Sequence, residues 1–220
     1  MVPFGRYTCA MKGKRPAAVA LAIALLSLLI LLARRVQRMR ADPTALPYEQ
    51  RLWAEFPRPL VSRARLRKVL RPRTGQRILE VGPGTGYYSL HTAGWLLPRG
   101  TLEILDVQQD MLDHTMRRAS AQGAQNIIPT QGDAQELPYA DNTFDSAYLV
   151  ATLGEIPNKV AALKELRRVL KPGGRLVVGE GQPDPHMIRF KTLQGLAETA
   201  GLSFEERVGG PLGYFASFEE

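Results

Sequence analysis

The chain has 220 residues, of which 45% are hydrophobic and 23% charged, and this suits one globular domain of ordinary size. The composition excludes a disordered chain, a collagen and a disulfide scaffold, since the single cysteine, Cys9, cannot form an internal disulfide. The formal charge of +8 is uneven. Residues 1–75 hold 16 basic and 3 acidic side chains, net +13, whereas residues 76–220 hold 13 basic and 18 acidic, net −5.

An apolar run, AAVALAIALLSLLILLA, occupies residues 17–33 and has basic residues on both sides. As a helix it would extend about 26 Å, slightly less than a hydrocarbon core of about 30 Å, and the basic flanks can snorkel. Because the run is apolar all round and no small-x-small cleavage site follows, we predict an uncleaved membrane anchor rather than a core helix or a cleaved signal peptide. The numbers of basic residues before and after the run are nearly equal, so the charge hardly determines the orientation of the anchor in the membrane. Met11 and Met39 are alternative starts, and a start at Met39 would remove the anchor.

Residues 41–75 continue basic and rich in proline, with a helical stretch near residues 60–70. Four basic side chains of this stretch form either a solvated face or a contact with anionic lipid headgroups: Arg63, Arg65, Arg67 and Lys68. We therefore divide the chain into a basic N-terminus with its anchor (1–40), a basic helical linker or cap (41–75), and a main domain (76–220).

After Gly75 the sequence alternates short apolar runs with helical periodicity, as is typical of a parallel α/β sheet. We predict strands at 77–81, 101–105, 126–130, 144–149 and 175–179. We predict helices at 85–97, 109–122, 159–170 and 186–199. Two further strands, 203–208 and 212–218, flank a Gly-Gly-Pro turn that suits a hairpin. The expected fold class is α/β, a doubly wound and mostly parallel sheet whose last strand is antiparallel.

The first strand ends in Glu80-Val-Gly-Pro-Gly-Thr-Gly and runs directly into a helix. Glycines at 82, 84 and 86 let the backbone turn tightly and approach a ligand, and the helix start offers free N–H groups and a positive dipole end. Asp106 ends the second strand, 20 residues beyond Gly86, where a carboxylate can accept hydrogen bonds from ribose hydroxyls. Asp133 follows the third strand and is either an acceptor for an adenine amino group or a turn aspartate.

These motifs occur in a particular order along the chain. The order is Glu-x-Gly-x-Gly-x-Gly (80–86), Asp106, Gly-Asp-Ala (132–134), Phe-Asp (144–145) and Leu-Arg-Arg-Val-Leu-Lys-Pro-Gly-Gly (166–174). Over about residues 75–220 the chain thereby resembles the class I S-adenosylmethionine-dependent methyltransferases.

The resemblance implies a seven-stranded sheet with an antiparallel last strand and S-adenosylmethionine as cofactor. It implies that Glu80 and the loop from Gly82 through Gly84 to Gly86 lie at the methionine portion of the cofactor. It likewise implies the remaining contacts: Asp106 on the ribose hydroxyls, Asp133 with Ala134 at the adenine, and Leu149 with Val150 at the sulfonium.

An NAD-dependent dehydrogenase shares part of this geometry, with its own glycines and ribose acid. Its fingerprint needs the third glycine three places after the second, whereas here glycine recurs at two-residue steps and position 87 is tyrosine. The glycine spacing therefore favours the methyltransferase.

Methyl transfer from a sulfonium mostly needs alignment and exclusion of water, so no metal and no dedicated base are obligatory. A phenol, an acidic carbon or a thiol as acceptor would gain from a base. The candidates at the carboxyl edge are Glu155, Glu180 and His186. Glu155 stands near a position where many relatives carry histidine, and this departure puts a histidine base in doubt.

The acceptor is predicted to be small and hydrophobic, of the quinone, lipid, thiol or phenol type. No Asn-Pro-Pro-Tyr signature follows the fourth strand, and the main domain has no basic, aromatic-rich face, so no nucleic acid partner is expected. The general pattern looks like that of the quinone-biosynthesis methyltransferases. Because the cofactor is made in the cytosol, the anchored domain is expected on the cytoplasmic side. Two alternatives stay open: a nucleic-acid methyltransferase that uses the basic N-terminal arm, and a membrane-tethered cofactor-binding protein without catalysis.

Overall fold

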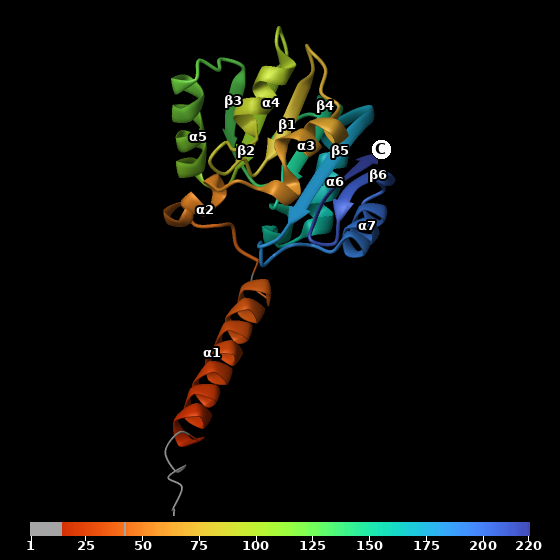
Figure 1. Cartoon of the computed structure of the whole chain (residues 1–220). Helices are drawn as coiled ribbons and strands as arrows, with labels where there is room; N and C mark the ends of the chain where they lie inside the picture. Colours follow the sequence, from red (N-terminus) through yellow and green to blue (C-terminus); the bar gives the residue numbers. More distant parts are fainter. Residues whose placement is uncertain (1–14, 42) are drawn as a thin grey trace, which may run out of the picture. The chain divides into compact units, whose positions relative to one another are not determined.

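The computed structural model describes residues 15–41 and 43–220 and divides into two compact units at the junction of Asp42 and Pro43 (Figure 1). The first unit contains a single described element, the helix α1 (Arg15–Ala41). The predicted three-part division at residues 40 and 75 stays a prediction.

The expectation of a membrane anchor at residues 17–33 is wrong, and with it the single-pass localisation with a cytoplasmic domain. Within residues 15–41 and 43–220, no helix is both long and apolar enough to cross a membrane. The apolar run folds as part of α1. Beyond Ala33 the helix continues into the basic sequence that starts at Arg34.

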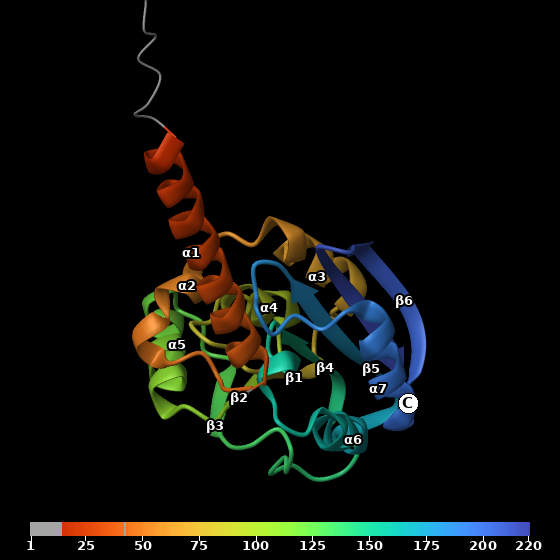
Figure 2. The same ribbon diagram turned by 90° about the horizontal axis from the view of Figure 1, so that it is seen from below.

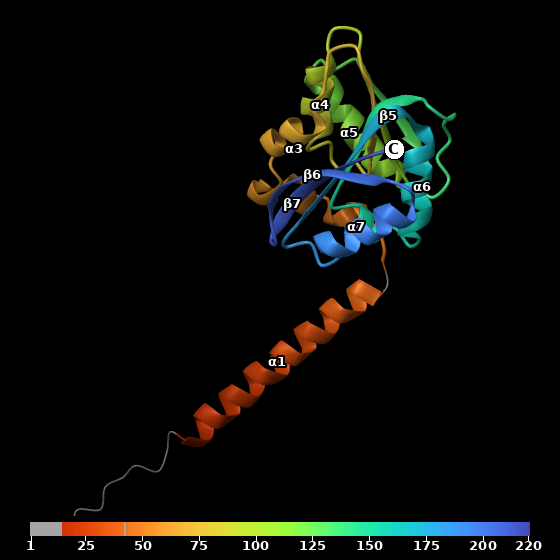
Figure 3. The ribbon, with the colours of Figure 1, turned by 90° about the vertical axis from the view of Figure 1, so that its right-hand side faces the viewer.

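The second unit is built on a seven-stranded sheet with the order β3-β2-β1-β4-β5-β7-β6. The first five strands pair in parallel, and β7 pairs antiparallel with both β5 and β6. Figure 3 looks onto this end of the sheet, where β6 and β7 lie beside α7 (Phe190–Thr199). The strands are β1 (Arg77–Val81), β2 (Thr101–Asp106), β3 (Ile127–Gln131), β4 (Phe144–Val150), β5 (Leu170–Gly181), β6 (Ser203–Gly210) and β7 (Gly213–Glu219). The predicted sheet and its antiparallel last strand are confirmed.

Helices cover both faces of the sheet and bury two hydrophobic cores (Figures 1 and 2). Neighbouring residues of β1 show the division, because side chains of a strand alternate between faces: Leu79 joins the core of α6 (Lys159–Val169) and α7, whereas Ile78 joins the other. That other core contains residues of α3 (Arg63–Leu70), α4 (Ser89–Leu96) and α5 (Gln109–Ala121). The short elements are η1 (Tyr48–Gln50), α2 (Leu52–Glu55), η2 (Pro59–Val61) and η3 (Leu153–Glu155).

Three predicted boundaries differ from the structure by four residues or more. The helix expected from residue 85 begins at Ser89, because Gly86 has φ +80°, a left-handed conformation that no α-helix contains. The helix expected from residue 186 begins at Phe190, since residues before it form a loop held by side chains at the sheet edge. The fifth strand begins at Leu170 rather than Arg175, because Leu170 already pairs with Phe144.

The topology decides where a ligand can bind. β1 pairs with β2 on one side and with β4 on the other, so the chain reverses its direction of winding between them. In open α/β sheets ligands bind at such a switch point, outside the carboxyl ends of the strands. The loops that follow β1, β2, β4 and β5 meet at this edge.

Candidate active site

The loop after β1, residues 82–86 and here called the glycine loop, needs its glycines for conformational reasons. Gly82, Gly84 and Gly86 have φ of +69°, +55° and +80°, which side chains rarely allow. A Cβ on Gly86 would also lie 2.9 Å from Cγ2 of Thr115. The spacing that the sequence showed is therefore a requirement of this backbone.

Side chains from α5 and from the loop after β4 hold the glycine loop by its carbonyl groups. Thr115 of α5 donates its hydroxyl to the oxygen of Gly84 at 2.9 Å, and Arg118 donates to the oxygen of Thr85 at 2.7 Å. From the other side, Thr152 donates to the oxygen of Gly82 at 3.4 Å. Sequence reasoning missed all three positions, because their role depends on contacts between distant segments.

Asp106 ends β2 beside the glycine loop, as the topology predicted. Its carboxylate accepts hydrogen bonds from the backbone N–H of Gln108 at 3.0 Å and from the backbone of Gly84 and Val107. Burial nevertheless raises the pKa of Asp106, although these N–H groups oppose the shift. The carboxylate is thus fixed in place while 8% of the residue stays open to a ligand.

Glu80 is a buried acid with an unused acceptor. Its Oε2 has no hydrogen-bond partner among the residues of the described chain. Burial raises the pKa of Glu80 to about 7, and the hydroxyls of Ser89 and Tyr148 lie close enough to lower it part of the way. A buried carboxylate oxygen without a donor costs free energy, so this position favours a cationic or hydrogen-donating ligand group.

Asp133 is a turn aspartate, which is one of the two roles that the sequence allowed for it. Its carboxylate accepts from the backbone N–H of Gln135 at 2.8 Å and from the side-chain amide of the same residue. Asp133 is exposed, whereas Ala134 and Val150 are buried at the same edge. The contact of Asp133 and Ala134 with an adenine stays a prediction, and so does the contact of Leu149 and Val150 with a sulfonium.

The three predicted base candidates lie together: Glu155 follows β4, Glu180 is near the end of β5, and His186 follows β5. A fourth residue, which the sequence analysis did not select, joins them. Asp184 accepts the backbone N–H of His186 at 2.8 Å, and a Cβ on Gly154 would lie 2.8 Å from the Cβ of His186, so η3 packs against this loop. Glu180 accepts the N–H of Ile188 at 3.1 Å through Oε2, while its buried Oε1 has no partner in the described chain. Glu155, Glu180 and Asp184 are called the acidic cluster below.

Mutual repulsion and burial keep the acidic cluster from ionising fully. Burial, then the neighbouring Asp184 carboxylate, raises the pKa of Glu155 to about 8. Burial raises the pKa of Glu180 well above its usual range, and the charges of Asp184 and Glu155 add to this. Arg58 opposes the shift, since its charge lowers the pKa of both Glu155 and Asp184. A carboxyl group with a pKa near neutrality can exchange a proton with a bound molecule.

A segment before α3 bridges the two halves of this edge. The N–H of Leu46 donates to Oε2 of Glu155 at 3.3 Å, and the carbonyl of Leu46 accepts from the side chain of Gln108 at 3.0 Å. Further along, the hydroxyl of Tyr48 lies 3.4 Å from Nδ1 of His114 on α5. The part of the chain expected to be a linker or cap thus contacts residues that follow β2 and β4.

These features together define a class of protein. A mostly parallel sheet with an antiparallel seventh strand, a glycine loop after β1 and an acid at the end of β2 are those of the class I S-adenosylmethionine-dependent methyltransferases. A solved methyltransferase of Aquifex aeolicus, described as SAM dependent, has the same fold, with a TM-score of 0.72 over 79% of this chain and 98% of its own, at 21% identity.

The chain belongs to the ubiE/COQ5 methyltransferase family, whose sequence profile matches residues 58–195. It is 41% identical over 109 residues to a ubiquinone/menaquinone biosynthesis C-methyltransferase of Cellvibrio japonicus, covering 49% of this chain and 44% of the relative. It is 37% identical over 120 residues to a demethylmenaquinone methyltransferase of Symbiobacterium thermophilum, covering 54% and 48%. The chain thus spans about half the length of the curated relatives it matches. This membership excludes the dehydrogenase alternative.

Proposed function

We propose that this chain transfers a methyl group from S-adenosylmethionine to a ring carbon of a quinol-type acceptor. Family membership carries the proposal, because the matched residues 58–195 include the glycine loop, Asp106 and the acidic cluster. The names of the bacterial relatives, which refer to ubiquinone, menaquinone and demethylmenaquinone, point to carbon methylation of a quinone precursor.

The residues at the carboxyl edge fit this cofactor. The unpartnered oxygen of Glu80 suits the ammonium group of the methionine portion, beside the left-handed backbone of the glycine loop. The fixed carboxylate of Asp106 suits two ribose hydroxyls, because it is ready to accept without reorganising. Ala134 and Val150 offer apolar surface for the adenine and the sulfonium. When bound, the cofactor supplies a methyl group already activated on a sulfonium.

The acidic cluster fits the proton balance of carbon methylation. As the new carbon–carbon bond forms and the sulfur–carbon bond breaks, the ring carbon must lose its hydrogen as a proton. Ionised Glu155 is the residue that we assign to accept it, since a pKa of about 8 lets this carboxyl both take and release a proton near neutral pH. Asp184 acts through Glu155 by raising its pKa, and Arg58 limits that effect.

The test is label transfer by the full chain. S-adenosylmethionine with a radioactive methyl group is incubated with demethylmenaquinol, and label is counted in the organic extract. We expect label on demethylmenaquinol and none on menaquinol, whose ring position is already methylated. Cofactor binding measured by calorimetry without label on any quinol would contradict the assignment of the acceptor while leaving the cofactor assignment intact.

A further inference from the structure

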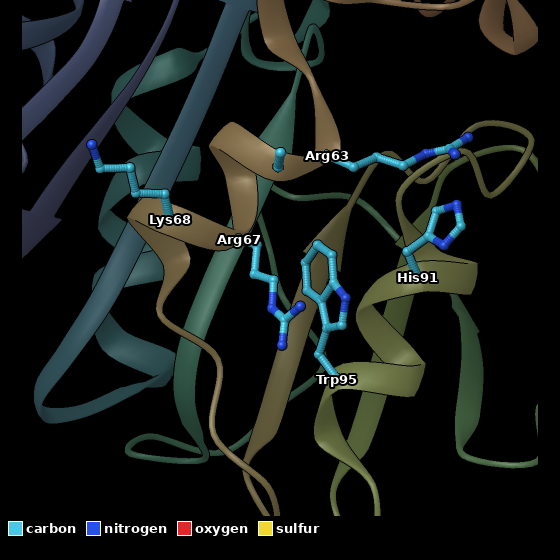
Figure 4. A pocket seen from close by; sticks show the side chains of 6 residues that line it. Arg63, Arg67, Lys68, His91 and Trp95 are labelled. Atoms are coloured by element: carbon cyan, nitrogen blue, oxygen red, sulfur yellow. The ribbon is translucent and has the colours of Figure 1, made fainter.

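A groove of about 450 Å³ lies between α3 and α4 (Figure 4). Its lining is basic: Arg63, Arg67 and Lys68 come from α3, and His91 and Trp95 come from α4. In Figure 4 Arg63 extends toward His91 and Arg67 lies beside Trp95, whereas Lys68 points away from both. The groove therefore presents two guanidinium groups, an imidazole and an indole ring.

The charge of this groove is not neutralised by carboxylates. Between Phe56 and Leu102 the sequence has nine basic residues and one acid, the buried Glu80. Two arginines of this stretch outside the groove do form ion pairs, Arg71 with Glu205 at 3.0 Å and Arg77 with Glu103. Arg63 and Arg67 form no ion pair with any carboxylate of the described residues.

Both arginines are held by contacts other than ion pairs. Arg63 donates to the carbonyl oxygen of Tyr87 at 3.1 Å, and its guanidinium lies 4.0 Å from the centre of the Tyr87 ring. The guanidinium of Arg67 lies 5.6 Å from the Trp95 ring. Stacked guanidinium groups keep N–H donors free at their edges and lose less freedom when they bind an anion. Burial and the charge of Arg63 also lower the pKa of His91.

We propose that the α3–α4 groove binds a ligand with a phosphate group, the oxygens on Arg63 and Arg67 and an apolar or planar portion against Trp95. A guanidinium fork matches the geometry of phosphate oxygens better than that of a neutral group. A concave surface with unpaired positive charge also concentrates anions from solution. This site does not depend on the methyl transfer proposed above, because none of its lining residues belongs to the glycine loop or the acidic cluster or is Asp106.

The test follows the fluorescence of Trp95 in the full chain. All proteins carry Trp53→Phe, so that Trp95 is the single source of tryptophan fluorescence. Three probes are titrated: inorganic phosphate, glycerol 3-phosphate, and vesicles of phosphatidylglycerol compared with phosphatidylcholine. The test variant is Arg67→Gln. The matched control is Arg73→Gln, which removes an equal charge from an exposed residue outside the groove.

We expect Arg67→Gln to weaken binding about tenfold or more and Arg73→Gln to change it less than twofold. Binding of the soluble phosphates would assign the site to a free phosphate compound, and binding of phosphatidylglycerol vesicles alone would assign it to a lipid headgroup. The proposal is overturned if no probe binds, or if both variants weaken binding equally, since the effect would then be that of net charge.

Discussion

Thr115 on α5 and Gly84 in the glycine loop are joined by a hydrogen bond of 2.9 Å, from the threonine hydroxyl to the glycine carbonyl oxygen. The two residues are 31 positions apart. Gly84 in turn binds Asp106 through its backbone, so Thr115 supports both the loop and the acid that is predicted to hold the ribose. The shape of the proposed cofactor site therefore depends on a residue that needs no contact with the cofactor.

Replacing Thr115 by valine tests this support. Valine keeps the branched shape of threonine but cannot donate, so the carbonyl of Gly84 loses its partner. We expect S-adenosylmethionine to bind about fivefold more weakly by calorimetry, the equivalent of about 1 kcal/mol for one neutral hydrogen bond. Thr199→Val is the control, because it removes a similar bond to the carbonyl of Gly195 far from the site. Equal affinity in both variants would show that the bond does not shape the loop.

A second prediction concerns Gly84, whose backbone is left-handed. Gly84→Ala strains a residue with φ +55° inside the glycine loop, whereas Gly123→Ala strains one with φ +71° where a Cβ meets no atom within 4 Å. Both variants should lose about 1 kcal/mol of stability in urea unfolding. Only Gly84→Ala should weaken cofactor binding, by tenfold or more. If Gly123→Ala weakens binding as much, the loss reflects stability rather than the loop.

Asp106→Asn removes the charge but keeps the shape of the residue predicted to hold the ribose. Hydrogen bonds to an ionised acceptor contribute about 1 to 3 kcal/mol, so affinity for S-adenosylmethionine should fall between roughly fivefold and a hundredfold. Asp110→Asn, an exposed acid in the first turn of α5, is the matched control and should bind normally. Unchanged affinity of Asp106→Asn would contradict the ribose assignment.

The fold and the first half of the site follow from local sequence, for identifiable reasons. Apolar runs alternating with helical periodicity define a parallel sheet, and the ends of parallel strands share one edge, so Glu80, the glycine loop and Asp106 were certain to meet once the strands were located. The tight turn of the glycine loop was also predictable from its glycines, because few other residues adopt left-handed backbone angles.

The second half of the site, the acidic cluster, depends on contacts that hydrophobic periodicity does not predict. Asp184 meets Glu155 because the loop before α7 packs against η3, whereas the sequence-based prediction of a helix from residue 186 placed only residues 180–185 in that loop. Leu46 contacts Glu155 through its backbone, which no side-chain pattern reports. The anchor at residues 17–33 was predicted from composition, and this prediction was wrong, since no helix of the described residues is long and apolar enough to cross a membrane.

The assignment of Glu155 predicts the pH dependence of the proposed reaction. Because the pKa of Glu155 is about 8, the ionised form grows as pH rises from 7 to 9, and the turnover rate should rise with it and then level off. Glu155→Gln should lower turnover at least tenfold and flatten this profile without changing cofactor affinity. Glu136→Gln, an exposed acid, should keep both rate and profile. A rise that persists in Glu155→Gln would assign the proton to another group.

Glu80 predicts that cofactor binding releases a proton. With a pKa of about 7, this carboxyl is mostly neutral at pH 6, and a cationic ligand group against it favours the ionised form. Calorimetric titrations at pH 6 in buffers of different ionisation enthalpy should therefore show close to one proton released, and almost none at pH 8.5, where Glu80 is already ionised. Glu80→Gln should remove the release at pH 6.

The same pKa determines how Glu80 affects stability without ligand. Its folded-state pKa lies above the unfolded value of 4.5, so the folded chain binds the proton more tightly and the free energy of unfolding falls as pH rises from about 4.5 to about 7. Glu80→Gln should lose this part of the slope in urea unfolding at pH 5 and pH 8, and Glu136→Gln should retain it. An unchanged slope in Glu80→Gln, together with proton release that persists, would show that Glu80 is ionised in the folded chain and that another group titrates.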